Sequence, residues 1–345
     1  MKKYLWVFLF AAPALAIFMA GLKVYYSMAI WQYEGESIVF EIKRGETFGQ
    51  INGRLYRRGI ISSAKIFHRY AQINDVMTKF RAGNFKIENG ETMLGVFDTL
   101  LKGKALSEEV TVPVGKNLFE IATIFEENKI IKATEFISLA KSQSYTEKLG
   151  IPGERMEGYL YPDTYHLTEN MDSKSLINLM YQNFLNKTKV LNFSTAPLGL
   201  TKHQVVILAS MVEKETGAGH ERPMIAGVFI NRLKKRMRLQ SDPTTIYGIY
   251  EEFNGNLRKR HLLEKTPYNT YKIPALPVGP ISNPGIESLA AVLKPKKHDY
   301  LYFVSQNDGT HVFSKNYKDH LKAVKEYQLN PKNRKGKSWR DLNKK

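Results

Sequence analysis

The chain begins with a long uncharged segment, residues 4–22, which follows a short start, residues 1–3, that contains two lysines. About 20 apolar residues are enough for a helix to cross the hydrocarbon core of a membrane. Basic residues favour the cytoplasmic side, so we expect residues 1–3 inside and the bulk of the chain outside. Ala14-Leu-Ala16 would also suit cleavage of a signal peptide. Because the apolar run continues beyond that point, the pattern favours a retained, single-pass anchor.

Three later segments share one pattern, in which a short strand meets a glycine turn and then an amphipathic helix. The turns are Gly45-Glu-Thr-Phe48, Gly90-Glu-Thr-Met93 and Gly115-Lys-Asn-Leu118. The strands expected before them are Ile38 to Ile42, Asn84 to Ile87 and Val110 to Val114. A small unit of this kind suits a surface module that binds a polymer. The pattern therefore predicts an α+β module over residues 36–105.

A larger domain is expected over residues 110–330. Its apolar periodicity predicts helices near 117–128, 133–141, 174–187, 202–215 and 223–236. Two β-branched and aromatic segments, Tyr300 to Val304 and His311 to Phe313, flank Asn307-Asp-Gly309, which has the residues of a hairpin turn. The fold class expected for the whole chain is α+β.

The helix expected at 202–215 ends in two carboxylates, Glu213 and Glu215, and Thr201-Lys-His-Gln204 before it has the pattern of a capping box. On a 3.6-residue repeat, Glu215 shares the apolar face with Met211, whereas Glu213 points roughly the opposite way. A carboxyl group at the end of an apolar stripe loses hydration, which raises its pKa. That would make Glu215 a proton donor at neutral pH. Spacing alone equally allows a solvated helix end with two surface glutamates.

The formal net charge of +18 requires an anionic partner, and a tail over residues 331–345 holds many of the basic side chains. No nucleic-acid-binding signature accompanies the charge, and an export segment precedes it, so we expect no nucleic acid. Anionic lipid or an anionic polymer outside the cell fits better. The chain has no cysteine, which excludes thiol catalysis, and its eight histidines show no ligand spacing. We therefore expect no metal and no cofactor.

Three loop segments combine tyrosine and neutral hydrogen-bonding side chains with proline and glycine: 157–165, 239–247 and 266–285. Sugars offer hydroxyls on one edge and C–H groups on their faces, which such residues can bind. The candidate substrate-binding residues are Glu157, Tyr161, Gln240, Asp242, Thr244, Tyr247, Asn269, Thr270, Ser282 and Asn283. The alternative interpretation is that these side chains cap turns and helices.

The motifs Leu208-Ala-Ser-Met-Val-Glu-Lys-Glu-Thr216, Val228-Phe-Ile-Asn-Arg-Leu233 and Met237-Arg-Leu-Gln-Ser-Asp-Pro-Thr-Thr-Ile-Tyr-Gly248 resemble those of the YceG-like endolytic murein transglycosylases. The resemblance extends to Glu157-Gly-Tyr-Leu-Tyr-Pro-Asp-Thr164 and Pro267-Tyr-Asn-Thr-Tyr271. It implies a single-pass protein of the inner, cytoplasmic membrane with a LysM-like module and a catalytic domain.

A member of that family would cut nascent peptidoglycan strands between N-acetylmuramic acid and N-acetylglucosamine. The cut leaves 1,6-anhydro-muramoyl ends and terminates elongation, and peptidoglycan synthases would be further partners. The family's catalytic glutamate falls on Glu215. Gln240, Asn269 and Ser282 are the residues that we expect, by motif position, to stabilise the transition state. Replacing Glu215 with glutamine should abolish turnover, and Glu213 is the control, expected to tolerate the same change far better.

Two other functions stay open from the residues. One is a peptidoglycan hydrolase, which would need a second carboxylate beside Glu215, either Glu157 or Asp163. The other is a non-catalytic tether between wall and membrane. The products distinguish the hydrolase, and an unperturbed Glu215 would favour the tether.

Overall fold

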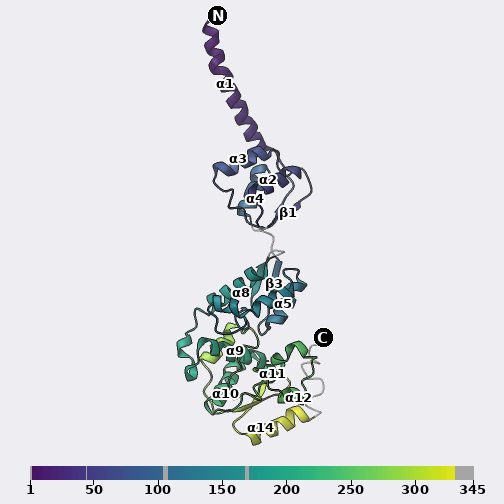
Figure 1. Cartoon of the computed structure of the whole chain (residues 1–345), viewed down its shortest axis with the longest axis vertical. Coiled ribbons are helices and arrows are strands. Elements are labelled where there is room, and N and C mark those ends of the chain that lie inside the picture. The colour runs from purple at the N-terminus through teal and green to yellow at the C-terminus, as the bar shows by residue number, and fades with distance from the viewer. Residues whose placement is uncertain (1, 44, 104–107, 168–170, 331–345) are drawn as a thin grey trace. The chain divides into compact units, whose positions relative to one another are not determined.

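The structure, a computed structural model, describes residues 2–43, 45–103, 108–167 and 171–330 (Figure 1). The expected basic tail, 331–345, lies outside the described residues. The chain divides into two compact units. Unit 1 contains residues 1–109 and 166–169, and unit 2 contains residues 110–165 and 170–345. The fold is a mixed α+β fold, as predicted.

The N-terminal helix α1 spans Lys2–Tyr25 and continues into a π-helical turn, η1 (Tyr26–Ile30). Within the described residues, Ala11–Ile30 has a mean hydropathy of 1.4 and is almost entirely unburied. This is the length and composition of a membrane-spanning helix or of a signal sequence. The helix therefore extends past the predicted end at Leu22.

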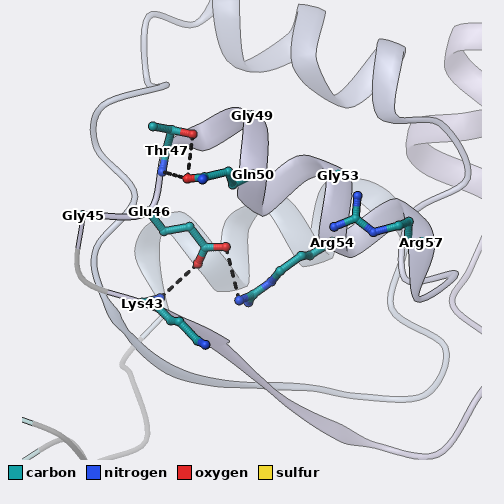
Figure 2. A pocket seen from close by; sticks show the side chains of 9 residues that line it. All are labelled: Lys43, Gly45, Glu46, Thr47, Gly49, Gln50, Gly53, Arg54 and Arg57. Carbon is teal, nitrogen blue, oxygen red and sulfur yellow. Dashed lines mark hydrogen bonds and ion pairs between the residues drawn. The ribbon is translucent and has the colours of Figure 1, made fainter.

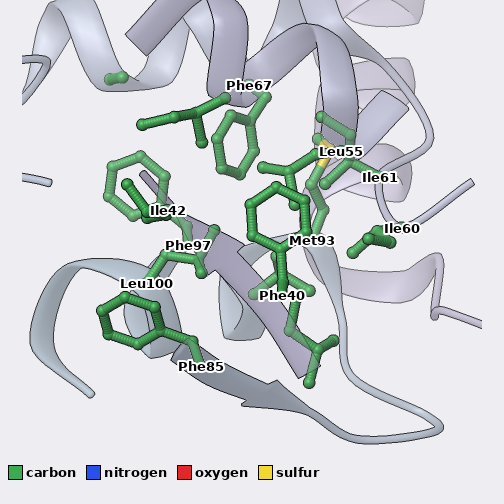
Figure 3. Packing of buried hydrophobic residues seen from close by; sticks show 14 of the residues in the cluster. Phe40, Ile42, Leu55, Ile60, Ile61, Phe67, Phe85, Met93, Phe97 and Leu100 are labelled. Atoms are coloured by element: carbon green, nitrogen blue, oxygen red, sulfur yellow. The ribbon is translucent and has the colours of Figure 1, made fainter. Parts of the chain in front are cut away.

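The rest of unit 1 is a two-stranded antiparallel sheet with three helices. Strand β1 (Ile38–Ile42) pairs with β2 (Gly83–Ile87), with Ile38 opposite Ile87. The helices are α2 (Phe48–Arg57), α3 (Ala64–Ile73) and α4 (Met93–Lys102). Their apolar faces enclose one core around Phe40, Leu55, Phe67 and Phe97 (Figure 3), in which the rings of Phe67 and Phe97 meet edge to face at 5.3 Å.

The three predicted glycine turns share one backbone geometry. Gly45, Gly90 and Gly115 all have positive φ angles, of 74°, 82° and 77°, which favour glycine. In each case the helix N-cap follows two residues later, at Thr47, Thr92 or Asn117. The repeated sequence pattern therefore corresponds to a repeated turn that starts α2, α4 and α5.

The third predicted strand is shifted. Strand β3 covers Glu108–Thr111 and pairs with β4 (Thr164–Leu167), so residues 112–114 lie outside it, contrary to the expected Val110 to Val114. The shift follows from the partner strand, because pairing with β4 ends at Thr111. Beyond β3, Val112 donates its N–H to the carbonyl of Asp163.

Unit 2 contains most of the helices and a β-hairpin. The helices are α5 (Leu118–Glu127), α6 (Ala133–Ala140), α7 (Gln143–Lys148), α8 (Ser173–Thr188), α9 (Lys202–Glu215), α10 (Arg222–Lys234), α11 (Asp242–Gly248), α12 (Lys259–Leu263), α13 (Ile286–Leu293) and α14 (Tyr317–Val324). Short 3₁₀ or π turns lie at Phe193–Thr195, Pro197–Gly199, Gly219–Glu221, Tyr250–Glu252 and Lys325–Leu329. The hairpin pairs β5 (Tyr302–Ser305) with β6 (His311–Ser314), around the predicted turn.

Helix α9 lies at the centre of unit 2 and packs against α10, α11 and α13. Residues 205–212 are all buried and, apart from Ser210, apolar, so this helix is enclosed on every side over two turns. Thr201 and Gln204 form the predicted capping box, in which each side chain bonds to the other residue's backbone N–H. Helix α10 has Pro223 in its first turn, as predicted, where a missing N–H costs nothing.

Candidate active site

Glu215 is the last residue of α9, and its side chain lines a cavity of about 460 Å³. The Thr216 hydroxyl bonds to the carbonyl of Val212 where the helix ends. The other lining residues come from α10, the α10–α11 turn, the start of α11, the loop between α12 and α13, the hairpin, α14 and the π turn after it: Arg232, Leu239, Gln240, Asp242, Tyr271, Tyr302, Phe303, Val304, Ser305, His311, Tyr317, His320 and Gln328. A rigid buried helix thus presents one carboxyl group to an open, largely polar and aromatic cavity.

Burial raises the pKa of the Glu215 carboxyl to about 7. The Ser241 hydroxyl, which donates a 2.6 Å hydrogen bond to Glu215, acts in the opposite direction, as does the positive charge of Arg232. The negative charge of Asp242 adds to the upward shift. The predicted raised pKa is therefore confirmed, and the alternative of a solvated helix end with two surface glutamates is wrong.

Glu213 points away from the cavity but is not a surface residue. Its side chain is 4% exposed, pairs with Arg222 at 3.1 Å and accepts the backbone N–H of Gly285 at 2.9 Å. Glutamine at this position would keep one of the two acceptor oxygens, and Arg222 also pairs with Glu287 at 2.6 Å, so the change removes one buried hydrogen bond and the negative charge. The expectation that Glu213 tolerates glutamine better than Glu215 stays a prediction, and this carboxylate links α9 to Arg222 and to the loop before α13.

Arg232 holds two walls of the cavity in place. Its Nε donates to the carbonyl of Leu301 and its Nη1 to the carbonyl of Leu239, both at 2.6 Å. The guanidinium lies 5.3 Å from the ring centroid of Tyr302. Sequence reasoning assigned Arg232 no role. A signal was present, because a basic residue continues the apolar face formed by Val228 and Phe229 of α10.

Residues 269–271 fix the segment 240–245 that leads into α11. The N–H of Ser241 donates to the Thr270 hydroxyl oxygen at 2.9 Å, and the Tyr271 hydroxyl donates to Asp242 at 2.7 Å. Gln240 has a φ of +50°, uncommon for a residue other than glycine, and its N–H donates to the carbonyl of Thr270. These bonds hold the Ser241 hydroxyl where it reaches Glu215.

Of the ten candidate substrate-binding residues, Gln240 and Asp242 line the cavity with Glu215. Thr244, Asn269 and Thr270 are fully buried among the hydrogen bonds that join residues 269–271 to the segment 240–245. The Asn269 amide donates to loop carbonyls, that of Glu264 among them at 2.6 Å. Ser282 is buried and donates to the carbonyl of Ser210 on α9. The polar atoms of Thr244, Asn269, Thr270 and Ser282 therefore form hydrogen bonds within the protein, as the alternative interpretation of turn and helix capping predicts.

Glu157, Tyr247 and Asn283 form a separate buried cluster. The Glu157 carboxyl accepts from the N–H of Leu118 at 3.0 Å, the Tyr247 hydroxyl at 2.8 Å and the Asn283 amide at 2.7 Å. Burial raises the pKa of Glu157 to about 7. None of these residues is among those that line the Glu215 cavity. The cluster joins α5, α11 and the loop before α13.

Two further sequence candidates lie elsewhere. Tyr161 is buried, and its carbonyl accepts the hydroxyl of Tyr165. Asp163, the alternative second carboxylate, pairs with Lys187 at 2.9 Å and accepts from Asn183 at 3.0 Å. Neither lines the cavity, so Asp242 is the carboxylate that shares it with Glu215.

The aromatic wall of the cavity was missed by sequence reasoning. Tyr302 of β5 stacks on His320 of α14 with centroids 5.1 Å apart, and Tyr317 lies beside both. The hairpin itself was predicted, but the packing of α14 on it brings together residues from two separate elements. Aromatic side chains spaced at 302, 317 and 320 carry no signal in the sequence that they share a surface.

Unit 1 has its own concave surface, of about 760 Å³, which runs from the turn at Gly45 along α2 to Arg57 (Figure 2). Gly45, Gly49 and Gly53 leave it open, since a side chain at Gly45 or Gly49 would meet nothing within 4 Å. Glu46 crosses it, pairing with Arg54 at 3.2 Å and accepting the N–H of Lys43. The groove is therefore polar and mixed in charge.

Comparisons with known proteins agree on one family. The family model described as the YceG-like family matches residues 40–326. The endolytic murein transglycosylase of Bacillus subtilis is 30% identical over 318 residues, which is 87% of each chain. That of Streptococcus pneumoniae R6 is 29% identical over 83% of this chain and 57% of its own length. A crystal structure of a yceG-like protein from Listeria monocytogenes, 30% identical, superposes with a TM-score of 0.57 over 84% of this chain and 99% of that one. The chain therefore belongs to the YceG-like family.

Proposed function

We propose that this protein is an endolytic lytic transglycosylase that cleaves murein strands, with Glu215 as its acid and base. The observation that carries the proposal is a carboxyl group of raised pKa, about 7, that faces an open cavity and accepts a hydrogen bond from Ser241. Near neutral pH the protonated and the ionised forms of a group with that pKa are both populated, so the group can donate a proton and take one back. The names of the relatives support the same reaction.

In this mechanism Glu215 first gives its proton to the glycosidic oxygen between N-acetylmuramic acid and N-acetylglucosamine while the C1–O bond breaks. The resulting carboxylate then takes the proton of the muramoyl C6 hydroxyl, whose oxygen bonds to C1 and closes the 1,6-anhydro ring. The proton returns to Glu215, so no water is consumed. Because the attacking hydroxyl belongs to the same sugar, positioning lowers the barrier.

The Gln240 amide lines the cavity and stays our proposed dipole for the developing positive charge. Asn269 and Ser282 are not proposed to stabilise the transition state, because their polar atoms bond to buried protein groups. Substrate binding at Glu157, Tyr161, Thr244, Tyr247, Thr270 and Asn283 is likewise replaced by a supporting role behind the cavity.

The hydrolase remains the rival reaction, and Asp242 is the residue on which it depends. An inverting or retaining hydrolase needs a second carboxylate that activates water or attacks C1. Asp242 lines the same cavity, but the Tyr271 hydroxyl already binds it at 2.7 Å. We propose that Asp242 contributes charge rather than a nucleophile, which its replacement can test.

We also propose that α1 anchors the protein in the cytoplasmic membrane, with its N-terminus inside and both units outside. Residues 36–105 would form a LysM-like module that holds glycan strands, residues 110–330 would form the catalytic domain, and synthases would be partners. The order β1-α2-α3-β2 and the open groove along Gly45 and Gly49 support the module. Co-sedimentation with insoluble murein tests it: filling the groove by Gly49→Trp should weaken binding, and unchanged binding would argue against it.

The experiment that tests the function uses the full chain in detergent on uncrosslinked murein strands, with mass spectrometry of the new ends. We expect anhydro-muramoyl ends whose rate of formation falls about 10³-fold in Glu215→Gln, the size of a lost general acid. Asp242→Asn should keep forming them. Reducing ends that vanish in Asp242→Asn would establish the hydrolase instead. Strand binding without any new ends would point to the tether.

A further inference from the structure

A run of basic residues covers the end of α10 and the turn that leads to α11, just before the cavity residues Leu239 and Gln240. Residues 232–238 read Arg-Leu-Lys-Lys-Arg-Met-Arg, with five basic residues and no acidic one. Arg232 is buried and occupied by backbone carbonyls, as described above. The other four, Lys234, Lys235, Arg236 and Arg238, are exposed.

These four side chains have no ionic partner within the protein. Among the residues that the structure describes, no carboxylate oxygen lies within 4.0 Å of their charged nitrogens. The partial negative charge at the C-terminal end of α10 favours Lys234 and Lys235 there. Arg236 and Arg238 lie beyond the end of α10, so the charge of the helix end does not explain them.

Arg236 occupies a position that usually belongs to glycine. Helix α10 ends in a Schellman motif, in which Met237 donates its N–H to the carbonyl of Arg232 and Arg236 donates to that of Leu233. The motif puts Arg236 at a φ of +56°, in the left-handed region. Glycine adopts this conformation without steric cost, whereas arginine does not. Lys129 after α5 and Asp75 after α3 have the same left-handed φ, so the arginine adds a small steric cost here and does not by itself point to a ligand.

The run leads directly into the cavity. Leu239 and Gln240 both line it, and Arg232 fixes the Leu239 carbonyl. Since consecutive Cα atoms are about 3.8 Å apart, Arg238 lies within about 8 Å of Gln240 along the backbone. Arg238 therefore lies next to the lining residues Leu239 and Gln240, and Lys234, Lys235 and Arg236 precede it in the same run.

We propose that Lys234, Lys235, Arg236 and Arg238 form a rim that binds the carboxylates of the peptide stems on the murein strand in the cavity. The inference rests on the proposed function. Stems branch from the muramic sugar whose C1 would react, so their free carboxylates pass close to the scissile bond. Exposed ion pairs of this kind are individually weak and sensitive to salt, but four of them on one rim add up.

The test measures KM and kcat of the full chain in neutral detergent on two substrates. One is native uncrosslinked strands; the other is the same strands with every stem carboxylate capped as a methylamide. Replacing all four rim residues by glutamine should raise KM on native strands about tenfold at low salt and leave kcat unchanged. On capped strands the wild type should already show the higher KM, and the variant should add nothing.

The matched control removes four exposed lysines of unit 2 that lie outside the rim: Lys129, Lys148, Lys174 and Lys189, each to Gln. It changes the net charge equally and should leave KM on native strands within about twofold. Arg236→Gly alone should raise KM without lowering thermal stability, because glycine suits the left-handed turn.

Three results would overturn the inference: an unchanged KM in the rim variant, an equal rise on capped strands, or an equal rise in the lysine control. In each case the wild type still forms anhydro ends, so the proposed function would survive. A wild type that forms no ends on either substrate would instead refute that function.

Discussion

Unit 2 contains two carboxyl groups, Glu157 and Glu215, whose pKa burial raises to the same value, about 7. Their surroundings differ. Glu157 is 1% exposed and accepts three hydrogen bonds from three parts of the chain. Glu215 faces a cavity, and Ser241 is its one hydrogen-bond donor among the described residues. A raised pKa therefore does not by itself identify a catalytic carboxyl group. Free hydrogen-bonding capacity toward a cavity distinguishes the carboxyl group that can contact a substrate.

The largest effect that we expect from this comparison is on stability. Glu157→Leu should lower the free energy of unfolding by about 3 kcal/mol or more, because the donors of Leu118, Tyr247 and Asn283 lose a buried acceptor. Urea denaturation at about pH 5.5 measures it, because at pH 8 the ionised Glu157 has already lost the stability that is linked to its raised pKa. Activity should fall only in proportion to the folded fraction.

Glu215→Gln is the contrasting variant in the same assay. Because burial raises the pKa of Glu215, its contribution to stability is greatest at low pH and is lost as the pH rises through about 7. The uncharged amide escapes that loss, so at pH 8 the variant should be at least as stable as the wild type. A destabilisation as large as that of Glu157→Leu would show that both carboxyls are structural.

A smaller effect should appear in the pH dependence of turnover. The Ser241 hydroxyl lowers the pKa of Glu215, whereas burial and the charge of Asp242 raise it. Ser241→Ala should therefore raise that pKa further and move the alkaline limb of the kcat/KM profile to higher pH. The rate near neutrality should fall about tenfold, as expected for one lost hydrogen bond to a charged group.

Ser210→Ala is the matched control on the same helix, since the Ser210 hydroxyl bonds to the carbonyl of Ile207 and to the N–H of Ile281 rather than to Glu215. It should cost stability but leave the alkaline limb in place. An equal shift in both variants would mean that Ser241 acts only through the general integrity of α9.

Local signals in the sequence were enough to predict much of the fold. The capping box at Thr201, the glycine turns at Gly45 and Gly115, and the hairpin at Asn307 each depend on residues within a few positions of one another. The loss of hydration at the Glu215 carboxyl followed from the apolar run before it. Strand β3 was misplaced because its extent depends on β4, some 50 residues away.

The candidate site was harder to predict, because the same side chains serve two purposes. Threonine, asparagine and tyrosine suit a sugar, but they equally suit a loop that must satisfy its own backbone. Thr270 and Gln240 both have neutral side chains that donate and accept hydrogen bonds, and only tertiary packing buries Thr270 and leaves Gln240 at the cavity. The wall of Tyr302 and His320 depends on how α14 packs on the hairpin.

The position of Glu215 at the end of α9 has one more consequence. The last turn of a helix exposes backbone carbonyls that carry partial negative charge, and these disfavour a second negative charge beside them, by about 0.3–1 kcal/mol. The backbone itself therefore helps to keep the proton on Glu215. Unlike the contributions of Ser241 or Asp242, this part of the proton affinity is encoded by no single side chain. Substitutions around the cavity can change the pKa of Glu215. They cannot remove the contribution of the backbone carbonyls as long as α9 ends at this residue.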